Sequence, residues 1–196
     1  TLLLMCIVAL FMAEMFCYVA AFPKYQASQV MAAVFSFLYA PVLLSFAYLT
    51  RECENGIYLV WLILISSWGC DTCAYVVGKL IGKKHIFPEL SPHKSLEGCI
   101  GGVAGAALIG GLYAHFFVEA AFPDQIITWT IAFICAAGAV MSMVGDLAAS
   151  AIKRNHNIKD YGKLIPGHGG IMDRFDSMTV TAPMTYFLAI LMIGLR

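Results

Sequence analysis

The sequence contains little charge. Only 12% of its 196 residues are charged, whereas 61% are hydrophobic; an ordinary soluble domain carries about 25% charged residues. This deficit excludes a typical soluble protein if the apolar residues form runs long enough to cross a bilayer. The formal net charge is zero, and we expect no nucleic-acid partner.

The sequence also lacks a complete zinc-binding pattern. Cys70 and Cys73 have CxxC spacing, but no second pair or histidine cluster accompanies them, as a zinc site would require. Most of the cysteines lie in apolar runs, where cysteine behaves as a small hydrophobic residue. Because internal repeats, low-complexity tracts and domain linkers are also missing, we expect a single membrane domain over residues 1–196.

Long apolar runs, by contrast, are abundant. A transmembrane helix needs about 20 predominantly apolar residues, and a backbone in lipid must satisfy its own hydrogen bonds. The sequence therefore predicts an all-α, polytopic transmembrane bundle with polar cytoplasmic loops. About six spans are expected, at residues 2–22, 30–49, 57–78, 98–117, 126–149 and 178–195. Because Thr1 leads directly into an apolar run, we expect the chain to be the C-terminal part of a longer protein.

The positive charges are unevenly distributed. Of 12 Lys and Arg residues, four lie in residues 79–97 and five in residues 151–176, whereas residues 118–125 contain none. The positive-inside rule then places both basic segments in the cytoplasm and residues 118–125 outside. Two predicted helices separate the basic segments, so the six-helix arrangement also puts them on one side.

Asp146 is an acidic residue inside a predicted span. A carboxylate at membrane depth is costly and usually faces the protein interior or a wet cavity. Ser150, Lys153 and Arg154 follow at i+4, i+7 and i+8 and share its helix face. A functional site is therefore predicted here, and pairing of Asp146 with Lys153 or Arg154 is the structural alternative.

Asp173 and Asp176 have i, i+3 spacing, so on a helical turn both carboxylates project the same way. Such like charges repel each other unless a cation lies between them. Mg²⁺ prefers oxygen ligands and is typically held by one or two carboxylates plus substrate phosphates. We therefore predict a magnesium site at Asp146, Asp173 and Asp176, whereas helix capping or pairing with Arg174 is the alternative.

Basic residues are interleaved with these acids. Membrane topology alone would explain their sign, but not their mixture with acids and a glycine turn. Arginine binds phosphate oxygens bidentately, and lysine acts as a point charge, so phosphate binding is predicted. The candidates are Lys153, Arg154, Lys159, Lys163 and Arg174. His168 could donate to a phosphate or act as a base, and a structural role is its alternative.

A second polar segment precedes residue 98. Asp71 is an intramembrane acid, and Ser91, Lys94 and Ser95 offer donors for a second phosphate-binding set. The predicted topology places this segment on the same face as residues 151–176. Glu14, within the first span, is assigned no role, because structural pairing and function explain it equally well.

Carboxylates that bind metal beside cations that bind phosphate suggest phosphoryl or nucleotidyl transfer. This chemistry depends on charge neutralisation and in-line positioning more than on a protein nucleophile. A water-soluble triphosphate would arrive from the cytoplasm, and a lipid phosphate would arrive sideways from the bilayer. A site at the ends of helices, at headgroup depth, can hold both.

At this point a family resemblance is apparent. Residues 150–176 resemble the signature of the phosphatidate cytidylyltransferases, also called CDP-diacylglycerol synthases. The match runs through Ser150, Lys153-Arg154, Lys159-Asp160, Gly162, Pro166, His168-Gly169-Gly170, Asp173-Arg174 and Asp176. The upstream segment resembles the family at Asp71-Thr72, Ala74-Tyr75, Gly78, Gly82-Lys83, Ser91-Pro92, Lys94-Ser95 and Glu97-Gly98. Tyr161 departs from the pattern, since smaller residues are common there, and residues 1–66 match only as hydrophobic spans.

The resemblance implies that CTP and phosphatidic acid give CDP-diacylglycerol and pyrophosphate, with Mg²⁺ and a second cation such as K⁺. Asp146, Asp173 and Asp176 would bind metal. The other catalytic candidates are Lys159, Asp160 and His168. The substrate-binding candidates are Asp71, Lys94, Ser95, Ser150, Lys153, Arg154, Gly169, Gly170 and Arg174. The active site would face the cytoplasm, in a bacterial inner membrane or the endoplasmic reticulum, and a homodimer is left open.

Other functions are weaker alternatives. A CTP-dependent lipid-alcohol kinase, such as a dolichol kinase, would need a base such as Asp160 or His168. A CDP-alcohol phosphotransferase would need a spaced Asp-Gly motif that is missing. An ion-coupled transporter would bind its ion at Asp71 and Asp146, but the polar residues cluster on one side rather than at mid-membrane.

Overall fold

The computed structural model describes residues 2–88, 90–92, 94–122, 127–164 and 169–194. Within these ranges the helices are all that forms extended regular structure, and an isolated antiparallel bridge pairs His85 with Ser95. The α-helices are α1 (Leu2–Ala20), α2 (Ala27–Phe37), α3 (Leu43–Glu52), α4 (Gly56–Leu64), α5 (Cys70–Ile81), α6 (Leu96–Tyr113), α7 (Ile127–Asn155) and α8 (Met172–Ile193). Short π-helical turns are η1 (Leu38–Val42), η2 (Ile65–Gly69) and η3 (Ala114–Val118), and η4 (Glu119–Ala121) is a 3₁₀ turn.

The described residues form six helices that are long and apolar enough to cross a membrane. Several arise because a π turn joins two α-helices end to end, as η1 joins α2 to α3 and η2 joins α4 to α5. The six spans are Leu3–Ala20, Ala27–Glu52, Gly56–Ile81, Leu96–Ala121, Ile127–Asn155 and Met172–Ile193. The all-α class and the six predicted spans are thus confirmed.

Two of the predicted boundaries differ from the structure in a way that affects the site. The fifth span was predicted to end at residue 149, but α7 continues to Asn155. The last was predicted to begin at residue 178, but α8 begins at Met172. Polar side chains lower the hydropathy at both positions without interrupting the backbone hydrogen bonds. Asp173 and Asp176 therefore lie in the first turns of α8 rather than ahead of it.

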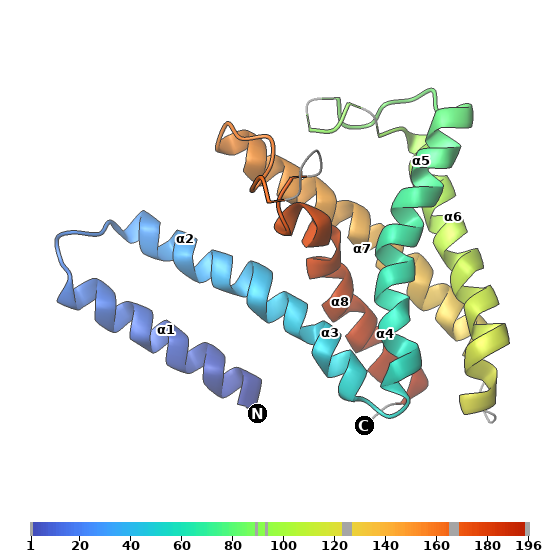
Figure 1. Cartoon of the computed structure of the whole chain (residues 1–196), viewed down its shortest axis with the longest axis horizontal. Helices are drawn as coiled ribbons and strands as arrows, with labels where there is room; N and C mark the ends of the chain where they lie inside the picture. The colour runs from blue at the N-terminus through green and yellow to red at the C-terminus, as the bar shows by residue number, and fades with distance from the viewer. Residues whose placement is uncertain (1, 89, 93, 123–126, 165–168, 195–196) are drawn as a thin grey trace.

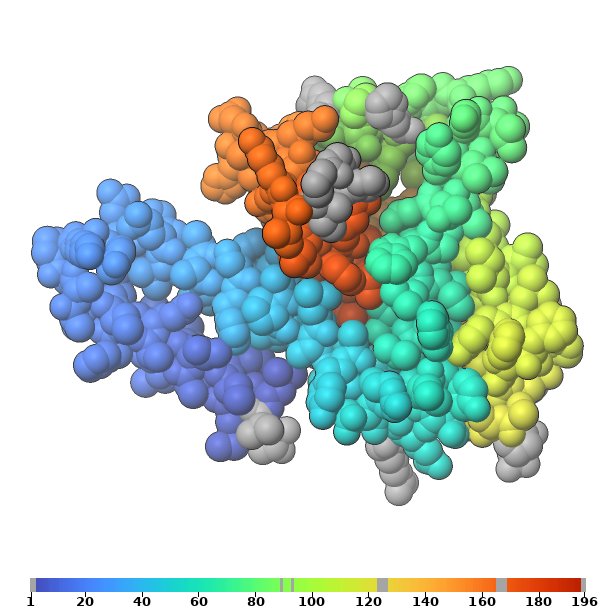
Figure 2. Space-filling view, viewed as in Figure 1, coloured from blue at the N-terminus to red at the C-terminus, as the bar shows by residue number. Residues whose placement is uncertain are grey.

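The helices form a bundle with an appended hairpin. In the bundle, α7 packs against both α6 and α8, and α3 packs along α8. Its main core contains buried side chains from α4, α7 and α8, including Leu59, Ile131 and Ala189. Helices α1 and α2 extend away from the bundle (Figure 1), and in Figure 2 they form an arm at its side. The α2 residues include none that are buried.

Glycines allow α5 and α6 to approach closely. A Cβ atom at Gly98 would lie 2.8 Å from the Ala74 carbonyl oxygen, and one at Gly102 would lie 3.0 Å from the Cys70 carbonyl oxygen. Small residues at four-residue spacing let membrane helices pack backbone against backbone. The separation of α5 and α6 is therefore fixed along the first two turns of α6.

The two polar segments lie at the same end of the bundle. Figure 1 shows the α5–α6 connection, in green, and the α7–α8 connection, in orange, at the end opposite to the last turns of α8. The predicted placement of residues 79–97 and 151–176 on one face is thereby confirmed.

Candidate active site

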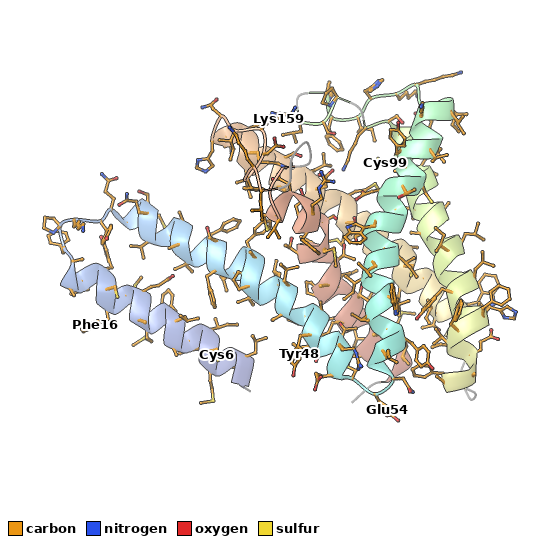
Figure 3. The ribbon with its side chains drawn as sticks, viewed as in Figure 1. Cys6, Phe16, Tyr48, Glu54, Cys99 and Lys159 are labelled. Atoms are coloured by element: carbon orange, nitrogen blue, oxygen red, sulfur yellow. The ribbon has the colours of Figure 1, made fainter. Side chains whose placement is uncertain are left out.

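A cavity of about 260 Å³ lies where α5, α6 and α7 meet the α5–α6 connection. Its charged lining residues are Asp71 on α5, Lys94 in the connection and Asp146 on α7. Cys99, which also lines it, is labelled in Figure 3 at the polar end of the bundle. The cavity therefore places both carboxylates and an ammonium group around one space.

Lys94 and Asp146 form an ion pair across this cavity. The Lys94 Nζ to Asp146 Oδ2 distance is 2.5 Å, and the two side chains are 20% and 31% exposed. The sequence had offered pairing of Asp146 with Lys153 or Arg154 as the structural alternative. For Lys153 this is wrong, because its ammonium group faces Asp173 and Asp176. The ion pair instead joins the α5–α6 connection to α7, two parts of the fold that are far apart in the chain.

A second charged centre lies at the start of α8, around the ammonium group of Lys153 from the last turn of α7. The Lys153 Nζ lies 3.0 Å from Asp173 Oδ1 and 3.8 Å from Asp176 Oδ2. The side chains of Lys153 and Asp173 are only 13% and 7% exposed. One ammonium thus offsets the repulsion between two carboxylates that were predicted to project the same way.

Asp173 also anchors the α7–α8 connection. Its Oδ2 accepts hydrogen bonds from the backbone N–H groups of Tyr161 and Gly170, both at 2.9 Å. Gly169 adopts a φ of 81°, a left-handed conformation that favours glycine. Both carboxylate oxygens of Asp173 therefore have protein partners, and the predicted ligands Gly169 and Gly170 shape the loop around them.

Tyr161 also belongs to this centre. In the sequence it was noted only as a departure from the family motif. Its hydroxyl donates to the Ala149 carbonyl oxygen at 3.3 Å, and the Lys153 Nζ lies 5.2 Å from its ring centroid. Burial raises the pKa of the Tyr161 phenol, and the negative charges of Asp176 and Asp173 raise it further. The phenol is therefore neutral at physiological pH and remains a hydrogen-bond donor.

The two centres face each other. Asp146 and Asp71 are close enough to Asp176 for their charges to interact. In the described ranges, however, no three acidic, histidine or cysteine side chains lie close enough to form a ready-made metal cage. Mg²⁺ is usually held by one or two carboxylates plus substrate phosphates rather than by such a cage. The carboxylates on α5, α7 and α8 fit that mode, and the magnesium site stays a prediction.

Comparison with known proteins gives consistent matches. Residues 1–192 match the sequence model of a family described as the Cytidylyltransferase family. The chain belongs to the cytidylyltransferase family. The phosphatidate cytidylyltransferase of Haemophilus influenzae is 38% identical over 139 residues, which cover 70% of this chain and 48% of the relative. The Bacillus subtilis enzyme of that name is 36% identical (69% and 48% covered), and the Thermotoga maritima enzyme is 37% identical (82% and 61% covered).

The chain spans about half the length of the curated relatives it matches. The family match nevertheless includes α1, α2 and α3, where the sequence motifs had offered only hydrophobic spans. The resemblance seen at residues 150–176 and in the upstream segment is thus confirmed at the level of the family.

The remaining predicted site residues lie around the two centres. Ser95 is 4% exposed, and its Oγ caps α6 by accepting from the Gly98 N–H at 3.1 Å. Ser150 is half-buried on α7, and Arg174 is exposed on α8, where its carbonyl oxygen accepts from the Trp68 indole at 3.4 Å. These positions leave their substrate-binding roles as predictions.

Other predicted groups lie at the polar surface. Arg154, Lys159, Asp160 and Lys163 are exposed, and Figure 3 labels Lys159 at the same end as Cys99. His168 lies outside the described residues. The structure therefore provides a surface of cations next to the two charged centres.

Proposed function

We propose that this chain carries the catalytic centre of a membrane-embedded phosphatidate cytidylyltransferase. The reaction converts CTP and phosphatidic acid to CDP-diacylglycerol and pyrophosphate. The observation that carries this proposal is the Lys94–Asp146 ion pair, because it joins the upstream family-like segment to α7, just ahead of the second such segment, at one cavity beside the Lys153 centre. The names of the relatives support the same reaction.

The two centres suggest a division of labour. Asp71, Lys94 and Ser95 would bind the nucleotide in the cavity between α5, α6 and α7. Lys153 and the exposed cations Arg154, Lys159, Lys163 and Arg174 would bind the triphosphate and the lipid phosphate. Ser150, Gly169 and Gly170 complete the proposed binding surface. Both substrates would then meet near Asp146 and Asp176.

The proposed step needs little from a protein base. An oxygen of the lipid phosphate forms a bond to the α-phosphorus of CTP, while the bond from this phosphorus to the oxygen bridging to the β-phosphorus breaks. Pyrophosphate leaves with that oxygen. The attacking monoester already carries negative charge near neutral pH, so Asp160 and His168 are not required to remove a proton. The protein's task is to orient the two anions and offset their repulsion.

Mg²⁺ is part of the proposal. It would be held by Asp146 and Asp176, with Asp173 nearby, and would neutralise phosphate charge when bound; a second cation such as K⁺ is proposed beside it. We expect EDTA to stop turnover and Mg²⁺ to restore it. The active site is proposed to face the cytoplasm, in a bacterial inner membrane or the endoplasmic reticulum.

A labelling experiment tests the reaction. The purified chain is incubated in lipid nanodiscs with phosphatidic acid, Mg²⁺ and CTP labelled either in the cytidine ring or at the γ-phosphate. The Bacillus subtilis relative serves as the positive control. We expect ring label in the lipid fraction and γ-label in pyrophosphate.

Two results would overturn the proposal. Transfer of the γ-label to a lipid alcohol, in parallel reactions supplied with dolichol or diacylglycerol, would identify a lipid kinase. If the control makes cytidine-bearing lipid and this chain does not, residues 1–196 do not carry the activity by themselves.

A further inference from the structure

Tyr39 is a polar residue in an otherwise apolar span. It lies in η1, a π turn that contains Pro41. Proline lacks the N–H group and clashes with the carbonyl four residues earlier in an α-helix, and a π turn widens the helix at that point. The Tyr39 ring stacks on that of Phe35, with centroids 5.5 Å apart. This local distortion fixes the direction of the phenol.

The Tyr39 hydroxyl is buried and makes no hydrogen bond to the described residues. It lies near the Thr179 hydroxyl without meeting hydrogen-bond geometry. Thr179 Oγ1 donates its own hydrogen to the Asp176 carbonyl oxygen at 2.7 Å, so it could only accept from Tyr39, and the two hydroxyl groups are not placed for that bond. A buried hydroxyl without a partner costs about 1–3 kcal/mol, so this donor needs an acceptor.

One charged group near Tyr39 is a cation, which could hold an anionic acceptor, and another is a carboxylate. Lys153, Asp176 and Tyr161 are all near enough to influence the phenol electrostatically. Tyr39 therefore points from the α2–α3 span toward the second charged centre at the start of α8. An anionic oxygen placed there would accept from Tyr39 and interact with the Lys153 ammonium.

The position of Tyr39 in the bundle favours a lipid as the source of this anion. Its neighbours Phe35 and Leu38 are 53% and 40% exposed, on a span where α2 has no buried residue. The cavity assigned to the nucleotide is lined by α5, α6 and α7 instead. Tyr39 thus lies between the lipid-facing surface and the polar centre, about 10 Å along α8 from its first residue, at the level of Thr179.

We propose that Tyr39 binds the lipid substrate by donating a hydrogen bond from its phenol to the lipid phosphate. This inference rests on the proposed function and adds a substrate-binding residue from a part of the chain that carries no polar motif. A phosphate monoester held there has its charge beside Lys153 and its acyl chains against the exposed side of α2.

The test uses Tyr39→Phe, which removes the hydroxyl and keeps the ring stacked on Phe35. The matched control is Tyr48→Phe, because Tyr48 is 65% exposed and lies far from Lys159 in Figure 3. We expect Tyr39→Phe to raise the KM for phosphatidic acid about tenfold or more, as loss of a hydrogen bond to a charged group does. The KM for CTP should not change, and Tyr48→Phe should match the wild type.

Binding provides a second measurement that does not depend on turnover. Short-chain phosphatidic acid is titrated into the wild type and both variants in phosphatidylcholine nanodiscs without CTP. We expect weaker binding to Tyr39→Phe alone, with a melting temperature equal to or higher than that of the wild type, because the variant no longer buries an unpartnered hydroxyl.

Three outcomes would overturn the proposal: an unchanged KM and affinity for phosphatidic acid, a raised KM for CTP alone, or a reduced kcat with both KM values preserved. The last would mean that Tyr39 positions Asp176. If the wild type makes no cytidine-bearing lipid, the proposed function fails, and the binding comparison still decides whether Tyr39 contacts a lipid phosphate.

Discussion

The Lys94–Asp146 and Lys153–Asp173 pairs have the same chemistry and different surroundings. Asp146 lines a cavity, and its side chain is 31% exposed. Asp173 is 7% exposed, and its two oxygens accept from an ammonium group and two backbone N–H groups. Asp146 is thus accessible to a ligand, whereas Asp173 already has the partners that a ligand would supply.

This comparison teaches that an acidic residue in a motif can serve the fold or the reaction, and that its partners indicate which. A carboxylate with its oxygens satisfied by protein donors holds a loop in place. A partly exposed carboxylate with a single lysine as partner can exchange that partner for a substrate or metal ion. Mutations at the two positions should therefore affect different properties.

Asp146→Asn should produce the largest loss of activity. The substitution preserves the shape of the side chain and removes the charge that faces the cavity. We expect kcat/KM to fall by about 10²–10³-fold, as when a group that stabilises the transition state is removed, with a melting temperature close to that of the wild type. Steady-state kinetics and thermal unfolding in nanodiscs measure both. Retention of full activity would remove Asp146 from the site.

Asp173→Ala should mainly affect stability. It removes the acceptor of two backbone N–H groups and leaves Lys153 with only the more distant Asp176, at 3.8 Å. Removal of one partner of a buried pair costs about 3–5 kcal/mol. We expect a lower melting temperature and faster proteolysis in residues 156–171, together with loss of activity. If the variant is inactive but as stable as the wild type, Asp173 acts in the reaction and the comparison with Asp146 is wrong.

Lys94→Met should weaken nucleotide binding. The ammonium pairs with Asp146 at the cavity, and its loss removes a cation available to phosphate. We expect the KM for CTP to rise about tenfold, since a hydrogen bond to a charged group contributes about 1.5–3 kcal/mol, with little change for phosphatidic acid. Titration with each substrate at saturating levels of the other separates the two. A larger change in the KM for phosphatidic acid than in that for CTP would mean that the cavity binds the lipid and that the Lys153 centre binds the nucleotide.

Lys159→Ala should have the smallest effect. Lys159 is exposed, and salt screens interactions between exposed charges. We expect a two- to threefold rise in the KM for CTP or phosphatidic acid at low salt, because an exposed ion pair contributes only about 0.2–1 kcal/mol. The stability of the protein should not change. The effect should disappear at about 0.5 M salt. An unchanged KM and rate at low salt would exclude contact with either substrate.

The sequence predicted the number of spans and the end of the bundle at which the polar groups gather, because hydropathy and charge distribution are local properties. It missed the start of α8, where Asp173, Arg174 and Asp176 lower the hydropathy of a segment that is helical. Helix formation there depends on tertiary partners of Asp173, such as Lys153 and Gly170.

The partners within the site were less predictable. Lys94 and Asp146 are 52 residues apart in the chain, as their numbers show, so local spacing suggested Lys153 or Arg154 instead. Tyr161 carried a signal only through its size in a motif, and Tyr39 carried none. The position of Tyr39 depends on the packing of α3 along α8. Which residue faces which is set by packing, and the sequence alone does not specify it.

Substitution of Gly98 or Gly102 is a way to change which ligands the cavity accepts. A methyl group at either position would clash with the α5 backbone. It would push α5 away from α6 at the wall of the cavity that carries Asp71 and Ala74. The width of the proposed nucleotide site would thus change through residues that bear no functional group, although no charged side chain is replaced.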